Sequence, residues 1–337
     1  MGQGGNNSPW PRNRQDRRRA SRRSAGTNAI ALAASDTYRL PRLHRFPPHP
    51  TDLTDRPMSG ETVSAESVSA ETVVVVPCYN EAARLDLQAF AAFLERSERI
   101  SLLLVDDGST DGTPRVLEQL RAAHPQRVAV LRLGKNVGKA EAVRRGVKLA
   151  LRRAPAMVGY WDADLATPLE AILQFRGVLI ERPEFALVMG SRVGLLGRQI
   201  RRSWKRHYLG RLFATVASWV LGLAVYDTQC GAKLFRVTRE TAQLFDRPFD
   251  TRWIFDVEIL ARMMTAARSG ERSAAEMIYE YPLEHWADVP GSRLRSHHFL
   301  VAALDLAVIR WRYRRGPVAE SNAPLPQPLH PARREAA

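Results

Sequence analysis

Apolar and polar residues form alternating blocks through the middle of the chain, and these blocks predict an α/β fold. Short runs rich in Val, Ile and Leu are typical of buried parallel strands. Such runs occupy residues 72–77, 100–105, 128–133, 157–161 and 185–189. The segments between them have helical spacing, and we expect helices at about 84–96, 111–123, 139–152 and 168–180. This β-α-β order predicts a doubly wound, mostly parallel sheet.

The regular alternation ends after residue 192. A basic segment leads into an uncharged apolar run over 212–226, and a second apolar stretch covers 299–311. The first run has fifteen residues, whereas a helix needs about 20 to cross a bilayer. We therefore expect both stretches to form amphipathic or core helices that do not span a membrane. One more strand is expected near 233–236 and one more helix near 253–264.

Both ends of the chain differ from this middle part. Residues 1–70 are rich in Arg, Pro, Ser and Thr and lack periodic apolar spacing, so they cannot bury enough surface to offset the entropy of ordering. We expect a disordered basic tail there and a second disordered tail over 317–337. One globular domain over 71–316 remains, in line with a chain that is 45% hydrophobic and 25% charged.

The chain is basic, with 50 Lys and Arg against 35 Asp and Glu, a formal charge of +15. Ten Arg stand in residues 1–50, whereas residues 192–211 hold seven basic residues and no acidic one, which indicates an anion site in the second segment. Cys78 and Cys230 lack disulfide or metal-ligand spacing, which favours a reducing, cytoplasmic location. The apolar patch over 29–34 is too short for a signal-peptide core.

Acidic residues follow three of the expected strands, in loops 77–81, 106–111 and 162–164. Each loop has a local explanation, because such residues also begin helices, cap them or end strands. Together, however, carboxylates at one edge of a sheet repel each other unless a cation or a donor-rich ligand neutralises them. Mg²⁺ or Mn²⁺ meets that need with one or two carboxylates, while phosphates and waters complete the coordination. The pattern therefore predicts a metal-bound diphosphate.

The same loops carry a resemblance. The motifs read Pro77-Cys-Tyr-Asn-Glu81, Val105-Asp-Asp-Gly-Ser-Thr-Asp111 and Asp162-Ala-Asp164. In this order and spacing they resemble the family 2 glycosyltransferases of the GT-A fold. Further segments resemble the dolichyl-phosphate glucosyltransferase branch of that family, so that the similarity covers about 72–315. These segments are 190–192, 227–235, 252–258 and 286–292.

The resemblance implies how a nucleotide sugar is bound. The residues that it assigns to the nucleotide are Pro77, Tyr79, Glu81, Asp106, Asp107, Lys139 and Asp162. Asp162 and Asp164 would meet the metal, Mg²⁺ or Mn²⁺, and the diphosphate. Lys139 either approaches the donor phosphates or is an ordinary lysine in the first turn of a helix. The sequence Leu165-Ala166-Thr167 after the last motif is nearer to the glucosyl pattern than to the mannosyl one, which favours UDP-glucose over GDP-mannose or UDP-GlcNAc.

The resemblance also implies an acceptor. A polyprenyl or dolichyl phosphate is already ionised at neutral pH, so it needs cationic residues rather than a general base. The candidates for holding this phosphate are Arg192, Arg201, Arg202, Lys233 and Arg252. Basic residues beside an apolar helix also suit a membrane surface, and we expect peripheral attachment at its cytoplasmic face; a solvated loop beside a core helix is the alternative. On this basis residues 71–191 form the nucleotide-sugar half, and residues 192–316 form the acceptor-facing half.

The expected reaction is an inverting displacement at the anomeric carbon, with Asp162, Asp164 and Arg192 in the catalytic centre. Asp256 is the candidate base if the acceptor is instead a soluble sugar or polysaccharide. Asp256 or Glu258 could equally orient an arginine or form a polar helix turn.

Other activities fit less well. Residues 134–139 lack the spacing of a phosphate-binding P-loop, and no strand leads into a dinucleotide fingerprint. A nucleic-acid binder acting through the Arg-rich tail is disfavoured because aromatic residues are sparse in that tail. We therefore expect no nucleic-acid partner.

Overall fold

The fold is described from a computed structural model covering residues 71–201, 204–268, 272–287 and 297–313. These residues all lie in one compact unit of the chain, 61–337. The tails expected over 1–70 and 317–337 lie outside the described residues, as does Arg202.

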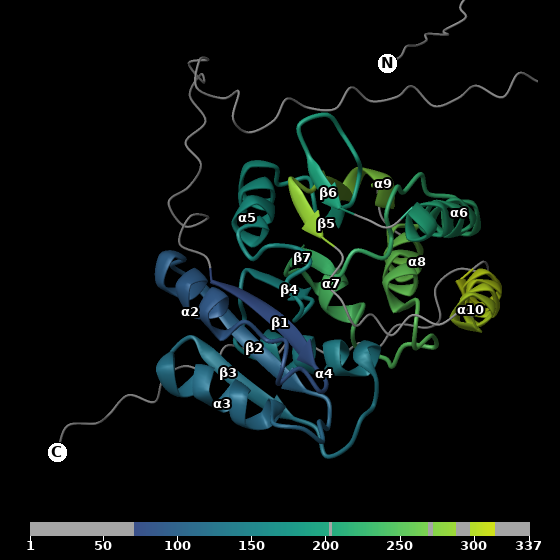
Figure 1. The fold of residues 1–337 in the computed structure, drawn as a ribbon. Helices are drawn as coiled ribbons and strands as arrows, with labels where there is room; N and C mark the ends of the chain where they lie inside the picture. The colour runs from purple at the N-terminus through teal and green to yellow at the C-terminus, as the bar shows by residue number, and fades with distance from the viewer. Residues whose placement is uncertain (1–70, 202–203, 269–271, 288–296, 314–337) are drawn as a thin grey trace, which may run out of the picture. The chain divides into compact units, whose positions relative to one another are not determined.

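A seven-stranded sheet organises the domain, in the order β3-β2-β1-β4-β7-β5-β8 (Figure 1). Its strands are β1 (Thr72–Cys78), β2 (Ile100–Asp106), β3 (Val128–Arg132), β4 (Met157–Trp161), β5 (Leu187–Ser191), β7 (Ala232–Arg236) and β8 (Ile278–Pro282). The five strands expected from the apolar runs are all present, and the mostly parallel α/β fold is confirmed. For β7 the sequence predicted a strand but not its direction; it pairs antiparallel with both β4 and β5.

Helices cover both faces of this sheet. They are α2 (Leu87–Arg96), α3 (Thr113–Ala123), α4 (Lys139–Leu151), α5 (Ala171–Glu181), α6 (Trp204–Leu221), α7 (Arg239–Gln243), α8 (Phe255–Ala267), α9 (Ala274–Met277) and α10 (His297–Tyr313). Successive residues of a strand point to opposite faces, so Val74 and Val76 of β1 pack with α2, α3 and α5, whereas Val73 and Val75 pack with α4 and α8. The sheet therefore separates two apolar cores.

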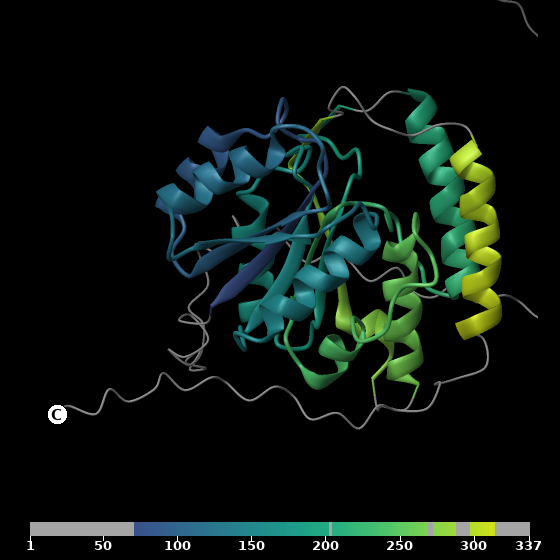
Figure 2. The same ribbon diagram turned by 90° about the horizontal axis from the view of Figure 1, so that it is seen from below.

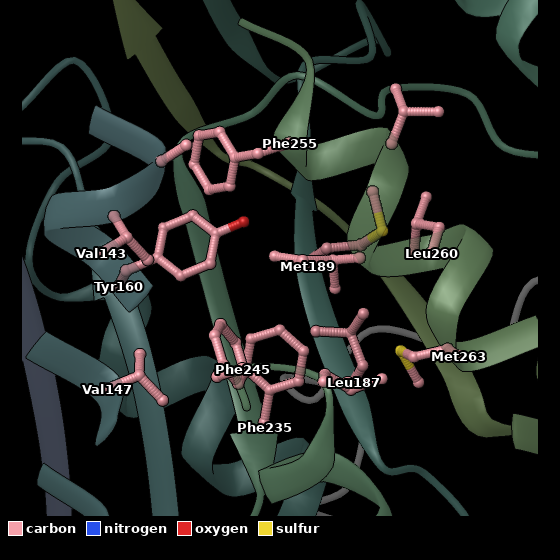
Figure 3. Packing of buried hydrophobic residues seen from close by; sticks show 14 of the residues in the cluster. Val143, Val147, Tyr160, Leu187, Met189, Phe235, Phe245, Phe255, Leu260 and Met263 are labelled. Atoms are coloured by element: carbon pink, nitrogen blue, oxygen red, sulfur yellow. The ribbon is translucent and has the colours of Figure 1, made fainter. Parts of the chain in front are cut away.

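The core on the α4 and α8 side is rich in aromatic rings. Figure 3 shows the rings of Tyr160 and Phe235, from the sheet, gathered with those of Phe245 and Phe255, from the segments that follow β7. The ring centroids of Tyr160 and Phe255 lie 5.7 Å apart, and the rings of Phe235 and Phe245 meet edge to face at 5.5 Å. This packing holds the start of α8 against the carboxyl end of β4.

Part of the segment after residue 192 lies outside the main sheet. β6 (Gln199–Arg201) and β9 (His285–Ala287) make a small parallel sheet, and α6 and α10 lie side by side (Figure 2). Both expected apolar helices are therefore present. Within the described residues, neither these nor any other helix is long and apolar enough to cross a bilayer. β7 and β8 come from the expected acceptor-facing half yet belong to the main sheet, so the two halves share one sheet.

Two helix glycines allow a matched test of the packing. A Cβ at Gly146 in α4 would overlap Val75 and lie 2.8 Å from Val105 Cγ2, whereas a Cβ at Gly177 in α5 would meet no atom within 4 Å. We expect Gly146→Ala to lower the free energy of unfolding by about 1–3 kcal/mol through overpacking. Gly177→Ala should raise it by up to about 1 kcal/mol, because alanine favours helix. Urea denaturation followed by circular dichroism measures both; equal effects would contradict this account of α4.

Candidate active site

Three loops meet at one edge of the sheet, because β2, β1 and β4 are parallel neighbours and their carboxyl ends coincide. Asn80, whose φ of 52° is tolerated by asparagine, donates its backbone N–H to Ser109 Oγ at 3.0 Å and accepts from Thr110 N at 2.9 Å. Glu81 N donates to Thr113 Oγ1 at 2.7 Å. The first two loops thus form one unit, as expected from their position.

Asp107 has a structural task that the sequence did not indicate. Its two carboxylate oxygens accept hydrogen bonds from Val137 N at 2.7 Å and from Gly138 N at 2.9 Å. Burial raises the pKa of Asp107, and these two bonds counteract part of that increase. Asp107 therefore holds the turn that begins α4 and so positions Lys139. Its neighbour Asp106 is also buried.

Asp162 and Asp164 follow β4 at the same edge, and Lys139 reaches them from α4. Lys139 Nζ lies 2.5 Å from Asp162 Oδ1, and this charge raises the pKa of Lys139 although burial lowers it. Burial, together with the charge of Asp162, raises the pKa of Asp164. Of the two alternatives for Lys139, the structure favours a place at the carboxylate centre over that of an ordinary helix lysine.

The carboxylate pair suits a divalent cation. No group of three or more His, Cys, Asp or Glu side chains in the described part of the chain could hold a metal by itself. Mg²⁺ and Mn²⁺ bound with phosphates need only one or two carboxylates. Burial and the charge of Asp162 both disfavour the ionised form of Asp164 and so raise its pKa, and a bound cation would favour that form. The residues present therefore fit a metal that is completed by a diphosphate.

Arg192 lies just beyond β5, at the same edge of the sheet. Its Nε and Nη2 donate to Asp227 at 2.5 and 2.7 Å, and its guanidinium lies 5.2 Å from the Trp286 ring centroid. Asp227, and to a smaller extent Asp162, raise the pKa of Arg192 against the effect of burial. The guanidinium is thus held in a fixed orientation within the electrostatic reach of Asp162.

Lys233 requires a correction. It was expected to bind an acceptor phosphate, but its side chain is 0% exposed. Its ammonium donates to Asp256 Oδ1 at 2.6 Å, Cys230 O at 2.8 Å and Thr228 O at 3.1 Å. All three of its hydrogens are thereby used inside the protein, so Lys233 organises the loop before β7 and does not face an acceptor.

Asp256 is likewise poorly suited to act as a base. It is 4% exposed, and its Oδ1 accepts from both Lys233 and the Tyr160 hydroxyl, at 2.5 Å for the latter. Burial, with the charge of Asp256, raises the pKa of Tyr160 well above its usual value, so the hydroxyl stays protonated. Its neighbour Glu258 pairs with Arg262 at 2.7 Å, which matches the alternative of orienting an arginine.

The remaining basic candidates are distributed differently. Arg252 is exposed and lies over the α4 turn, with Nη2 3.5 Å from where a Cβ of Gly138 would be. It thus stands on the same side as Lys139. Arg201 ends β6, but its side chain lies outside the described part, like Arg202.

The expected nucleoside residues also lie at this edge. Pro77, Tyr79 and Glu81 are all half-buried. Glu81 pairs with Arg84, whose Nη2 lies 2.6 Å from Oε1.

The sequence did not assign three residues that shape the site: Asp227, Glu280 and Gly231. Glu280 on β8 accepts from Tyr226 N at 2.8 Å and from Asp227 N at 2.9 Å, and so supports the partner of Arg192. Gly231 accepts from Asp162 N at 3.0 Å, and a Cβ there would overlap the Asp162 carboxylate. An acidic residue within the aromatic strand β8 was the available signal for Glu280, and the signal for Asp227 and Gly231 was their place in the segment 227–235, which resembles the glucosyltransferase branch.

Comparisons with known proteins agree with this geometry. The model of glycosyl transferase family 2 matches residues 73–239. A dolichyl-phosphate beta-glucosyltransferase of Trichomonas vaginalis is 33% identical over 258 residues, which cover 73% of this chain and 72% of the relative. The chain belongs to glycosyltransferase family 2.

The human dolichyl-phosphate beta-glucosyltransferase is 32% identical to this family 2 glycosyltransferase, with 72% of this chain and 76% of the relative covered. Among solved structures, glucosyl-3-phosphoglycerate synthase from Mycobacterium tuberculosis has a TM-score of 0.54 at 19% identity. The match covers 78% of this chain and 87% of the synthase, which was solved with Mn²⁺, UDP-glucose and phosphoglyceric acid. This likeness shows that the chain has the GT-A fold.

Gly231→Ala tests the carboxylate centre of the glycosyltransferase. The new methyl group would displace the Asp162 carboxylate, and we expect Mn²⁺ affinity in the presence of a nucleoside diphosphate to fall about 10–100-fold. Electron paramagnetic resonance of free Mn²⁺ measures this affinity, with Gly177→Ala as the control. Unchanged affinity in folded Gly231→Ala would rule out Asp162 as a metal ligand.

Proposed function

We propose that this glycosyltransferase transfers glucose from UDP-glucose to a polyprenyl or dolichyl phosphate and forms a β-linked lipid-phosphate sugar. The observation that carries the proposal is the state of Asp256. The carboxylate best placed by sequence to be a base is buried and paired with Lys233. An acceptor that arrives already ionised requires no base, and a lipid monophosphate is such an acceptor. The names of the relatives support this acceptor and glucose as the sugar.

The donor side rests on the carboxylate centre. Asp162 and Asp164 would hold Mg²⁺ or Mn²⁺, which supplies positive charge to the departing diphosphate. Lys139 contributes a second positive charge from the start of α4. Asp107 keeps that helix start in place through Val137 N and Gly138 N. Tyr79 has a ring face that suits the base of the nucleotide.

The acceptor side rests on Arg192. Asp227 engages two of its three guanidinium nitrogens and fixes its direction, while Trp286 supports the guanidinium from one side. A preorganised guanidinium loses little freedom when it binds a phosphate, so its position favours an in-line attack on the anomeric carbon. Further positive charge along the path of the acceptor phosphate to Arg192 would come from Arg252 and, by their sequence position, from Arg201 and Arg202.

A membrane surface completes the proposal. α6 and α10 expose large apolar side chains: Tyr208, Leu212, Val216 and Trp219 from α6, and Val301, Leu304, Val308 and Trp311 from α10. Paired apolar faces with interfacial Trp and Tyr suit shallow insertion into a bilayer. The basic residues of 192–211 favour an anionic, cytoplasmic face. There the lipid phosphate would meet Arg192.

Transfer of label tests the reaction directly. The assay contains radiolabelled UDP-glucose, Mn²⁺ or Mg²⁺ and a polyprenyl phosphate. We expect the label to enter an organic-soluble product, and mild acid should then release the labelled glucose from that product. Asp164→Asn should lower the rate at least about 100-fold, because it removes a charge that holds the metal near the leaving group. GDP-mannose and UDP-GlcNAc serve as competing donors. Transfer from one of these and not from UDP-glucose would overturn the donor assignment.

Vesicle binding tests the membrane surface. Leu212→Glu with Trp219→Glu places two charges on the exposed face of α6, and we expect sedimentation with anionic vesicles to fall at least about tenfold, since burying a charge in the interface is costly. Leu173→Glu, on an exposed position of α5, is the matched control. Equal sedimentation of both variants would contradict docking through α6 and α10.

A further inference from the structure

The loop of residues 226–231 connects the two sides of the active site. At one end Asp227 binds the backbone N–H and guanidinium of Arg192. At the other end Gly231 bonds Asp162 N and packs directly against the Asp162 carboxylate. One short loop therefore touches both the proposed phosphate ligand and the proposed metal ligand.

Two charged side chains, the half-buried Glu280 and the buried Lys233, fix the backbone of this loop. Glu280 accepts from the N–H groups of Tyr226 and Asp227, at 2.8 and 2.9 Å. Lys233 donates to the carbonyls of Thr228 and Cys230, at 3.1 and 2.8 Å. Its third hydrogen bond goes to Asp256 Oδ1, which keeps the ammonium in place. Backbone N–H and C=O groups outside regular elements need partners, which can be side chains, other backbone groups or water. Here protein charges satisfy them, so the 226–231 loop is expected to move as one body.

Its surroundings leave little room for independent movement. Cys230 Sγ lies only 2.8 Å from where a Cβ of Gly190 would be, which places the thiol directly against β5. Arg211 of α6 lies over the Tyr226 ring, 3.7 Å from its centroid. A displacement of Arg192 is therefore transmitted through Asp227 to a loop whose other end cannot shift without moving Asp162.

We propose that the 226–231 loop is a rigid strap that couples the binding of the acceptor phosphate at Arg192 to the binding of the metal and diphosphate at Asp162, with Glu280 and Lys233 as its positioning residues. The proposal rests on the proposed function. Coupling of this kind requires two sites and an element whose arrangement both ligands favour. The strap is that element: a phosphate bound to Arg192 acts through Asp227 on the position of Gly231, and so on the Asp162 carboxylate that meets the donor.

The test measures coupling rather than turnover. The affinity of the full chain for UDP with Mn²⁺ is measured by titration calorimetry, with and without saturating farnesyl phosphate. In the wild-type protein we expect farnesyl phosphate to tighten this binding at least about fivefold. In Glu280→Gln an amide NH₂ faces the N–H donors of the strap, so the effect should fall to less than about twofold, while each ligand alone still binds.

Matched variants separate this result from general damage. Glu276→Gln makes the same change on α9, at an exposed residue whose side chain caps its own helix, and it should keep the wild-type coupling. Asp227→Asn weakens the contact between the strap and the Arg192 guanidinium, so this variant should also lose the coupling. It provides a second test if Glu280→Gln does not fold. Thermal melts by circular dichroism verify folding.

Three outcomes would overturn the proposal. Wild-type protein that binds both ligands independently would overturn it and leave the proposed function intact. Folded Glu280→Gln or Asp227→Asn with full coupling would do the same. Wild-type protein that binds no farnesyl phosphate or no UDP would instead overturn the proposed function, and the coupling with it.

Discussion

The concentration of negative charge at one edge of the sheet is the constraint on which the site depends. Parallel strands bring their carboxyl ends together, and here these ends carry Asp106, Asp107, Asp162 and Asp164. Part of this charge is compensated inside the protein, by backbone N–H groups at Asp107 and by Lys139 at Asp162. Burial and the nearby charge of Asp162 raise the pKa of Asp164. A site of this kind is built to accept positive charge.

The antiparallel strand β7 extends the edge. Because it runs opposite to β4 and β5, its amino end lies beside their carboxyl ends. This direction brings the 226–231 loop next to Asp162 and Arg192, and it sends Lys233 into the interior between them. Had β7 been parallel, the loop before it would have lain at the opposite edge. The acceptor side of the site is therefore a consequence of one reversed strand.

Sequence patterns predicted the parts of the fold that depend on local spacing. The first four strands agree with the apolar runs to within one residue at either end, and Tyr79, Asp107 and Asp162 lie at one edge as expected. The start of β5 was misplaced by two residues, since its pairing with β7 and β8 determines its bounds. Lys233 was misassigned because the sequence of β7 does not show that this strand lies between β4 and β5, where the lysine side chain is buried. Glu280 and Gly231 act through distant partners, which no local pattern records.

The pairing of Arg192 with Asp227 has a consequence for turnover. An unpaired guanidinium would hold any phosphate strongly, including the product. A lipid monophosphate carries close to two negative charges near neutral pH, whereas the phosphodiester formed by glycosylation carries one. With Asp227 neutralising part of the guanidinium charge, the attraction for any phosphate is weaker, and since it scales with the charge of the ligand, it is weaker still for the singly charged product than for the acceptor. Under the proposed reaction, glycosylation itself thus lowers the affinity of Arg192 for the lipid and favours its return to the membrane.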